Sequence, residues 1–236
     1  MKFGKNLERV VELSDPEWSP FWLNYKHLKK MLKEVQHTPA PSAAGAPIAK
    51  PPNGLSSPEA LSKSAGEVAF FKFLRQELRK CKEFFASAES QFLVRRARVR
   101  EGWRQLTAVP EVPVDGEQYK RLMAACVRLY KDLLLLENFA IMNYTAFSKI
   151  LKKHDKLTGF CTRERYMKNV VNMTTSFTHY PRVLEMLEDV EELFRGIQTH
   201  ANIAHSSEEQ LFIDAMRRYA RSELSCATSC RSLALA

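Results

Sequence analysis

Four lysines in the segment Phe147 to Lys156 have the residue type and the spacing expected of an anion-binding surface. They lie at offsets 0, 3, 4 and 7: Lys149, Lys152, Lys153 and Lys156. Residues at these offsets share one face of an α-helix. Like charges three or four residues apart cost a helix about 0.2–0.5 kcal/mol per pair. An anionic ligand would relieve that repulsion, which is why this face is a candidate binding site.

The same four lysines are also compatible with two roles that require no ligand. Lysines in the last turn of a helix complement the helix dipole, and Gly159 follows the run as a typical helix stop. A run of charges can also be no more than a solvated face. The spacing alone does not decide among these three roles.

The composition indicates a basic protein with a sizeable core. The chain has 236 residues, enough for one large or two small domains, and 45% of them are hydrophobic. Glycine is scarce, with only 8 residues, which disfavours a turn-rich β architecture. The formal net charge of +9 favours an anionic partner: nucleic acid, an acidic membrane surface or a phosphorylated small molecule.

The cysteines indicate a reducing compartment rather than a disulfide framework. They form an odd, scattered set of five: Cys81, Cys126, Cys161, Cys226 and Cys230. No run approaches 18 consecutive apolar residues, and the N-terminus has no apolar signal-peptide core. We therefore expect no transmembrane segment and a cytoplasmic protein. The nucleus, or the cytosolic side of a membrane for a piece of a longer protein, is the alternative.

Apolar periodicity predicts an all-α fold around two long antiparallel helices. The first runs from residue 67 to about 106, with one apolar stripe: Phe71, Leu74, Leu78, Cys81, Phe85, Ala88 and Phe92. The second runs from about 118 to 156. A short proline-containing loop between them predicts a helical hairpin. Shorter helices are predicted after it, at 161–174 and 181–198, and after a capping box at 206–209.

An N-terminal helical hairpin is predicted to pack on this bundle. Its first helix covers residues 1–13, and Ser19-Pro20 predicts the start of a second that ends near Val35. Residues 37–66 are rich in Pro, Ala and Ser, which predicts a flexible insert within the domain. We therefore expect one domain over residues 1–198. Residues 199–236 are expected to form a C-terminal helix and a flexible tail that could lead to a further module.

The second N-terminal helix places three residues of binding type on one stripe. Tyr25, Lys29 and Lys33 are spaced by four, so they share a helix face. In an antiparallel bundle the lysine end of the second long helix lies near the start of the first, where the insert delivers the N-terminal helices. These three residues can therefore approach the four lysines.

Signals for catalysis, nucleotides and metals are missing from the sequence. No GxxxxGK[ST] loop and no GxGxxG turn is present. None of the six histidines pairs with Cys, Asp or Glu at structural-zinc spacing, and His154 is assigned no role. We therefore predict neither an enzyme nor a metal site nor a cofactor.

Four segments of the chain resemble the SPX domain, a helical phosphate-status sensor of eukaryotic phosphate-homeostasis proteins. They are MKFGKNL at the start, PEW with NYKHLKKMLK at 16–33, VAFFKFLRQEL at 68–78, and LLLLENFAIMNYTAFSKILKKHDKLTG at 133–159. The last is the most specific, because it combines the asparagine and aromatic pattern with the lysine face. The long Pro/Ala insert is the chief departure from the family pattern.

The resemblance implies a ligand and a site. SPX domains bind inositol pyrophosphates and, more weakly, inositol hexakisphosphate and other polyanions. The implied binding residues are Tyr25, Lys29, Lys149, Lys152, Lys153 and Lys156, with Lys33 and Lys2 as flanking basic positions. The implied role is a sensor module that transmits phosphate status to a protein partner or a fused effector. The alternative, from another class, is a basic helical bundle that binds anionic membrane or nucleic acid non-specifically.

Overall fold

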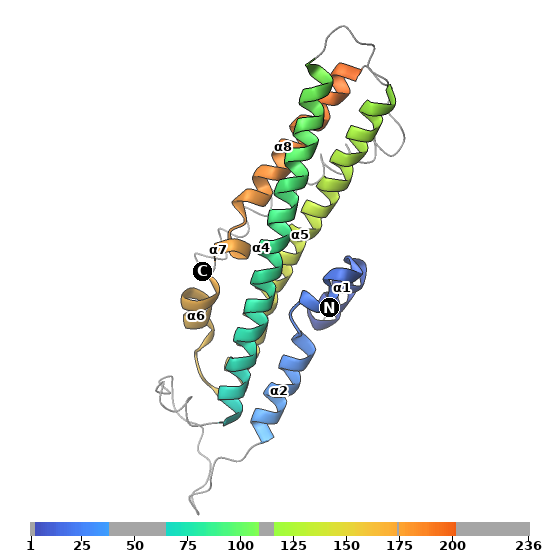
Figure 1. The fold of residues 1–236 in the computed structure, drawn as a ribbon. Coiled ribbons are helices and arrows are strands. Elements are labelled where there is room, and N and C mark those ends of the chain that lie inside the picture. The colour runs from blue at the N-terminus through green and yellow to red at the C-terminus, as the bar shows by residue number, and fades with distance from the viewer. Residues whose placement is uncertain (1–2, 38–64, 109–115, 174, 202–236) are drawn as a thin grey trace, which may run out of the picture. The chain divides into compact units, whose positions relative to one another are not determined.

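The structure is a computed structural model that describes residues 3–37, 65–108, 116–173 and 175–201 (Figure 1). Its elements in chain order are α1 (Phe3–Leu13), the 3-10 helix η1 (Pro16–Phe21), α2 (Tyr25–His37), α4 (Ala65–Thr107), α5 (Gly116–Thr158), α6 (Arg163–Tyr166), the π-helix η2 (Met167–Val171), α7 (Thr175–Thr178) and α8 (Pro181–Ala201). Within these ranges there is no β-strand, so the predicted all-α class is confirmed.

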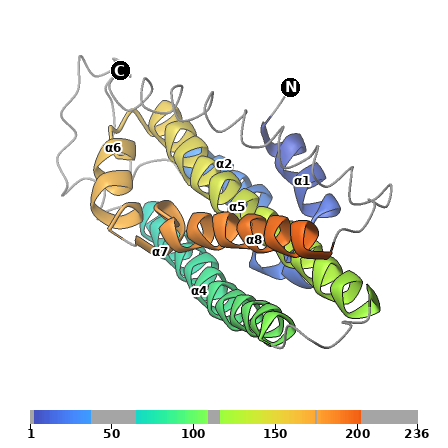
Figure 2. The same ribbon diagram turned by 90° about the horizontal axis from the view of Figure 1, so that it is seen from above.

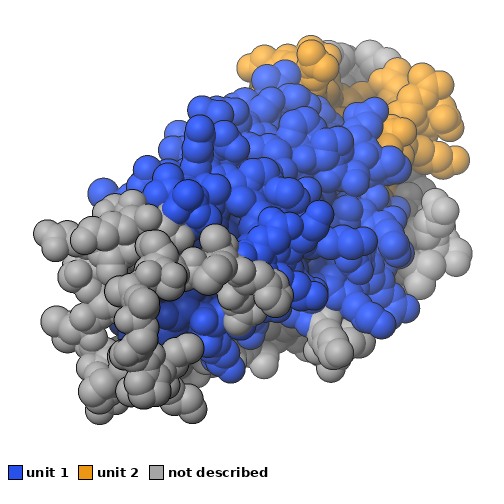
Figure 3. All heavy atoms as spheres, turned by 90° about the horizontal axis from the view of Figure 1, so that it is seen from below, with its two compact units in different colours: residues 1–95, 131–188 blue, residues 96–130, 189–236 orange. Residues whose placement is uncertain are grey.

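The chain divides into two compact units, coloured separately in Figure 3. Unit 1 comprises residues 1–95 and 131–188, and unit 2 comprises residues 96–130 and 189–236. The unit boundaries fall within α4, within α5 and within α8. All the predicted binding residues belong to unit 1.

In unit 1 the long helices α4 and α5 run antiparallel, as predicted. The start of α4 meets the end of α5, where Glu67 Oε2 lies 2.7 Å from His154 Nε2. Further along α4, Arg95 forms a 2.6 Å ion pair with Asp132 near the middle of α5. The predicted apolar stripe of α4 is buried except at Phe71, which is half-buried. Phe70 takes the core position instead and is fully buried.

The predicted start of the second N-terminal helix was wrong. Ser19-Pro20 lies inside η1, and the extended backbone of Trp22 (φ −66°, ψ 150°) ends that short helix. The residue that caps α2 is Asn24, whose Oδ1 accepts a 3.0 Å hydrogen bond from the backbone N–H of His27. An asparagine side chain satisfies a free amide of the first turn in this way. The Ser-Pro signal therefore belongs to η1, one element before the helix that it was expected to start.

Buried hydrogen bonds fix the start of α2 against both long helices. Asn143 of α5 is fully buried; its Oδ1 accepts from Leu23 N at 2.9 Å and its Nδ2 donates to Phe139 O at 2.8 Å. On the α4 side, Glu77 Oε2 accepts from Asn24 N at 2.7 Å. Figure 2 shows α2 close to α5, as these bonds require. The N-terminal helices are therefore held where they can reach the end of α5.

The helix after α5 is shorter than predicted, and its second half is π-helical. The helix expected at 161–174 is the four-residue α6 followed by a π-type turn, in which Asn172 N donates to Met167 O at 2.8 Å. That wider turn brings Met167 and Val171 to the same buried side. The helix expected at 181–198 is confirmed as α8. The predicted helix after 206 and residues 38–64 of the insert lie outside the described residues.

Unit 2 is held by ion pairs and a hydrogen bond among its own helix segments. Arg96 and Arg100 of α4 lie 2.7 Å and 3.1 Å from the carboxylate of Asp189 in α8. Tyr130 of α5 donates a 2.8 Å hydrogen bond to Glu191. The two arginines are therefore structural partners of α8.

Candidate anion-binding site

The lysine face lies on the last turns of α5, opposite a buried apolar side. Lys149, Lys152 and Lys156 are exposed and Lys153 is half-buried. On the other side of the helix, Phe147, Ile150 and Leu151 have no exposed surface. The end of α5 is thus amphipathic, as predicted from the sequence: one side is apolar and buried, and the other carries lysines.

Lys153 is the point at which α2 meets this face. The pKa of Lys153 is lowered from its ordinary value, first by burial and then by repulsion from Lys29 and Lys33. Each of those two lysines belongs to α2, so the predicted approach of α2 to the end of α5 is confirmed. The positive charges of the two α2 lysines thus disfavour the protonated form of Lys153.

Tyr25 lies beside Lys29 against the start of α1. Its ring meets Phe3 edge-on, with centroids 5.2 Å apart. A Cβ added at Gly4 would lie 3.5 Å from the Tyr25 ring and 3.8 Å from Lys29 Nζ, which are ordinary contact distances and show that both side chains lie against this turn of α1. Burial raises the pKa of Tyr25, so its hydroxyl remains a neutral hydrogen-bond donor.

No acidic side chain pairs with the lysines of this site in the described ranges. Elsewhere lysines do find partners, since Lys80 lies 2.7 Å from Glu77 and Lys30 lies 3.9 Å from Glu34. The unpaired set, among the residues that the structure describes, is Lys29, Lys33, Lys149, Lys152, Lys153 and Lys156. We call this set, together with Tyr25, the lysine surface. The remaining predicted position, Lys2, lies outside the described residues.

A buried polar network under the lysine surface was missed by the sequence analysis. His154 is fully buried; its Nε2 contacts Glu67 Oε2 at 2.7 Å, and its Nδ1 lies 3.2 Å from Asp155 Oδ1 and 3.1 Å from Thr162 Oγ1. The ring stacks on Phe70 with centroids 5.3 Å apart. Glu67 and His154 are 87 residues apart, so no local spacing could have identified the pair.

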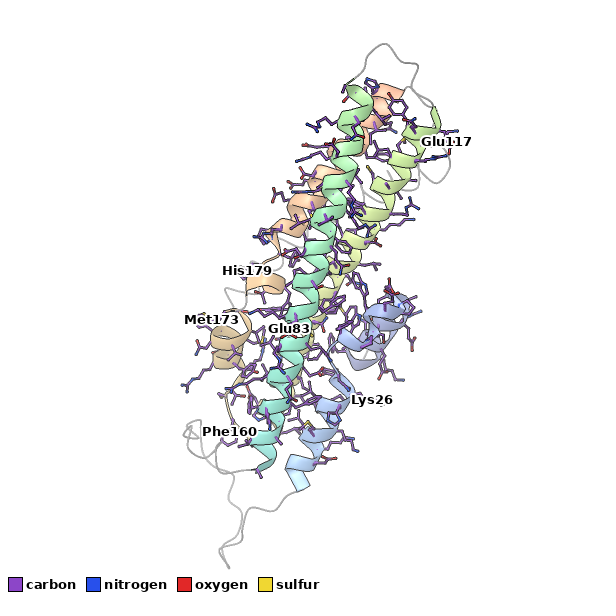
Figure 4. All side chains as sticks on the ribbon, in the orientation of Figure 1. Lys26, Glu83, Glu117, Phe160, Met173 and His179 are labelled. Atoms are coloured by element: carbon purple, nitrogen blue, oxygen red, sulfur yellow. The ribbon has the colours of Figure 1, made fainter. Side chains whose placement is uncertain are left out.

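The electrostatics of this network favour the protonated form of His154. Burial alone would lower the pKa of His154, but the hydrogen bonds and charges of Glu67 and Asp155 raise it above its ordinary value. The contact between His154 and Glu67 joins the start of α4 to the last turns of α5, next to Lys153. Phe160 packs on the same ring, with centroids 6.4 Å apart, and lies near the start of α4 in Figure 4.

Asp155, inside the lysine run, is turned towards α6. It accepts hydrogen bonds from Thr162 N at 3.0 Å, from Thr162 Oγ1 at 2.6 Å and from Arg163 N at 3.0 Å. Burial would raise the pKa of Asp155, but these bonds and the bond from His154 lower it overall. Both oxygens of this carboxylate are thus engaged by the chain that follows α5.

Neither a metal centre nor a membrane span is found in the described ranges. They contain no group of three or more His, Cys, Asp or Glu side chains that could hold an ion. None of the described helices is both long and apolar enough to cross a bilayer. Cys81 and Cys126 are buried free thiols, and Cys161 is an exposed one.

Comparison with known proteins identifies relatives of this chain. SPX domain-containing protein 1 of Arabidopsis thaliana is 28% identical over 220 residues, which are 92% of this chain and 80% of the relative. SPX domain-containing protein 5 of Oryza sativa subsp. indica is 34% identical over 159 residues, which are 67% of this chain but only 53% of the relative.

A solved structure shows the same fold. It is the SPX domain of Chaetomium thermophilum Glycerophosphodiester Phosphodiesterase 1, determined in complex with inositol hexakisphosphate (InsP6). It matches 84% of this chain and 99% of its own with a TM-score of 0.60 and 25% sequence identity. The family pattern described as SPX domain matches residues 1–67 and 103–170, which include every residue of the lysine surface. The chain belongs to the SPX domain family.

Proposed function

We propose that this chain is a phosphate-status sensor module that binds inositol polyphosphates and pyrophosphates on the lysine surface. The observation that carries the proposal is the crowding of Lys153 by Lys29 and Lys33, with no acidic partner in the described residues. Such an uncompensated cluster favours a multiply charged anion. The related domain of known structure was solved with InsP6, which supports a ligand of this class.

The side-chain chemistry suits a ring crowded with phosphates. Lysine ammonium groups are compact point charges on flexible stems, so they can follow phosphates in several directions. Each contact is a charge-assisted hydrogen bond, roughly twice as strong as a neutral one. Tyr25 adds a neutral, directional donor at the edge of the surface. Binding, rather than catalysis, is the proposed activity.

The domain bounds, the effector and the cellular location are proposed as well. We assign the binding domain to residues 1–198, and Lys2 as a flanking contact. We infer that the ligand-bound domain acts on a protein partner or a fused effector. The unpaired thiols Cys81, Cys126 and Cys161 suit a reducing compartment, which supports a cytoplasmic location.

Calorimetric titration of the purified chain with InsP6, an inositol pyrophosphate and orthophosphate tests the proposal. We expect the first two to bind far more tightly than orthophosphate. Lys153→Ala should weaken InsP6 binding about tenfold or more, because a hydrogen bond to a charged group is worth about 1.5–3 kcal/mol. The matched control is Lys72→Ala, an exposed lysine of α4 outside the surface, which should lose far less.

The same titration separates this proposal from a non-specific basic surface. If only net charge mattered, Lys72→Ala and Lys153→Ala would weaken binding alike, and Tyr25→Phe would have no effect. A specific site predicts that Tyr25→Phe weakens binding although it changes no charge. Equal losses for both lysine variants with a silent Tyr25→Phe would refute the proposed site.

A further inference from the structure

We propose that Arg163 of α6 is a further phosphate-binding residue, so that the site extends across α5 to the side away from α2. This inference rests on the proposed function and deepens it. Nothing in the sequence pattern singles out Arg163, which lies after the helix-ending Gly159. Its place follows from its two hydrogen bonds to α5, at Asp155 and at Ser148, and from the bonds of the preceding Thr162 to Asp155.

The backbone of Arg163 is fixed to the lysine end of α5. Its N–H donates to Asp155 Oδ2 at 3.0 Å, and the preceding Thr162 donates to Asp155 Oδ1 through both its N–H and its hydroxyl. The carboxylate that receives these bonds is itself held by the buried His154. The start of α6 is therefore tied to the α5 turn that bears the lysines. Figure 2 shows α6 beside that end of α5.

The side chain of Arg163 runs back along α5. Its Nε lies 3.2 Å from Ser148 Oγ, a hydrogen bond that the arginine donates. Ser148 precedes Lys152 by one helical turn, and Asp155 follows Lys152 by three residues. An arginine anchored at both positions must pass alongside Lys152, because residues three or four apart on a helix are neighbours.

Arg163 and the α2 lysines flank α5 on different sides. Lys153 is the lysine that approaches Lys29 and Lys33, whereas Arg163 bonds Ser148, which shares a helix face with Lys152. Successive residues of an α-helix differ by about 100° around its axis. The basic surface therefore continues from α2, over the lysines of α5, to α6.

The charge of Arg163 is available to a ligand. Among the described residues no carboxylate forms an ion pair with its guanidinium, since Asp155 receives the backbone N–H instead. Ser148 occupies Nε alone, which leaves the two terminal nitrogens as donors. A planar guanidinium binds phosphate oxygens in a bidentate manner, which ammonium groups cannot do.

The span of this surface indicates the class of ligand that would use Arg163. A single phosphate seated between Lys153 and the α2 lysines lies on the other flank of α5 and would not need it. A fully phosphorylated inositol ring presents phosphates in several directions at once and can contact both flanks. Arg163 should therefore favour InsP6 and its pyrophosphate derivatives over orthophosphate.

Titration of the full chain with InsP6 and with orthophosphate tests the inference. Arg163→Gln should weaken InsP6 binding about tenfold, or about 1.4 kcal/mol, and should leave orthophosphate binding within about twofold. The matched control is Arg165→Gln, which removes the same charge from the opposite side of α6 and should weaken InsP6 binding less than about threefold through screened attraction alone. The backbone bonds to Asp155 persist in Arg163→Gln, and a thermal melt verifies its fold.

A second variant separates a direct contact of Arg163 with the ligand from a structural role of its hydrogen bond to Ser148. Ser148→Ala removes the partner of Nε without changing any charge, so it should alter InsP6 affinity much less than Arg163→Gln does. Equal losses for Arg163→Gln and Arg165→Gln, while Lys153→Ala abolishes tight binding, would overturn the role of Arg163 and leave the proposed function intact. Absence of tight InsP6 binding by the unmodified chain would overturn both.

Discussion

Replacing Glu67 by Gln should destabilise the domain, and more so at acidic than at alkaline pH. Glu67 is 3% exposed and its carboxylate lies 2.7 Å from the fully buried His154. Removing one partner of a buried ion pair typically costs about 3–5 kcal/mol, because the other charge stays buried without compensation. Asp155 remains 3.2 Å from the imidazole, so we expect the lower end of that range, about 3 kcal/mol.

The pH dependence follows from the raised pKa of His154. A group whose pKa is raised on folding stabilises the fold fully below its unfolded value, which is 6.5 for histidine, and loses that contribution as the pH rises through the folded-state pKa. At alkaline pH the neutral imidazole can hydrogen-bond Gln as well as Glu. The difference in unfolding free energy between the two proteins should therefore shrink from about pH 6 to about pH 9.

Urea and thermal denaturation at these two pH values measure the effect. A loss of about 3 kcal/mol corresponds to a melting temperature roughly 6–12 °C lower for a domain of this size. The control is Glu83→Gln, which breaks an exposed 3.9 Å pair with Arg79 and should change stability by less than about 1 kcal/mol. The reasoning is refuted if Glu67→Gln costs less than about 1 kcal/mol, or if its cost is the same at both pH values.

Two further predictions concern other buried polar groups. Asn143→Leu should lower the free energy of unfolding by about 1–3 kcal/mol in urea titration, because the buried N–H of Leu23 loses its acceptor; an unchanged midpoint would contradict this. Burial raises the pKa of the Cys81 and Cys126 thiols to about 12, so iodoacetamide at about pH 8 should alkylate exposed Cys161 first, as mass spectrometry of the folded protein would show. Alkylation of all three thiols at equal rates would rule out that order.

The sequence predicted the parts of the fold that depend on long periodic patterns. The two long helices, and the burial of Leu74 and Leu78 on one apolar stripe, follow from apolar spacing over many turns. A pattern of that length predicts a helix even where a single position, such as Phe71, deviates from it. The approach of α2 to Lys153 also followed from topology, since an antiparallel hairpin allows only one end of α5 to meet the N-terminal helices.

The parts that escaped prediction depend on individual side-chain contacts. The cap of α2 is Asn24 rather than Ser19 because an extended Trp22 separates the two elements, and propensity does not encode that break. The Glu67–His154 pair joins residues far apart in sequence, so only packing reveals it. Arg163 likewise enters the candidate site through Ser148 and Asp155, not through a motif.

The crowding around Lys153 lowers the stability of the ligand-free domain at the site where we propose that the ligand binds. Burial first, and then repulsion from Lys29 and Lys33, lower the pKa of the Lys153 ammonium, so keeping it charged there costs the folded state free energy. A sequence optimised only for stability would replace these lysines, as it would any set of repelling charges on a surface. Selection for thermostable variants of the free domain should therefore enrich neutral or acidic residues at these three positions. Lysines kept there despite that cost would indicate selection for ligand binding.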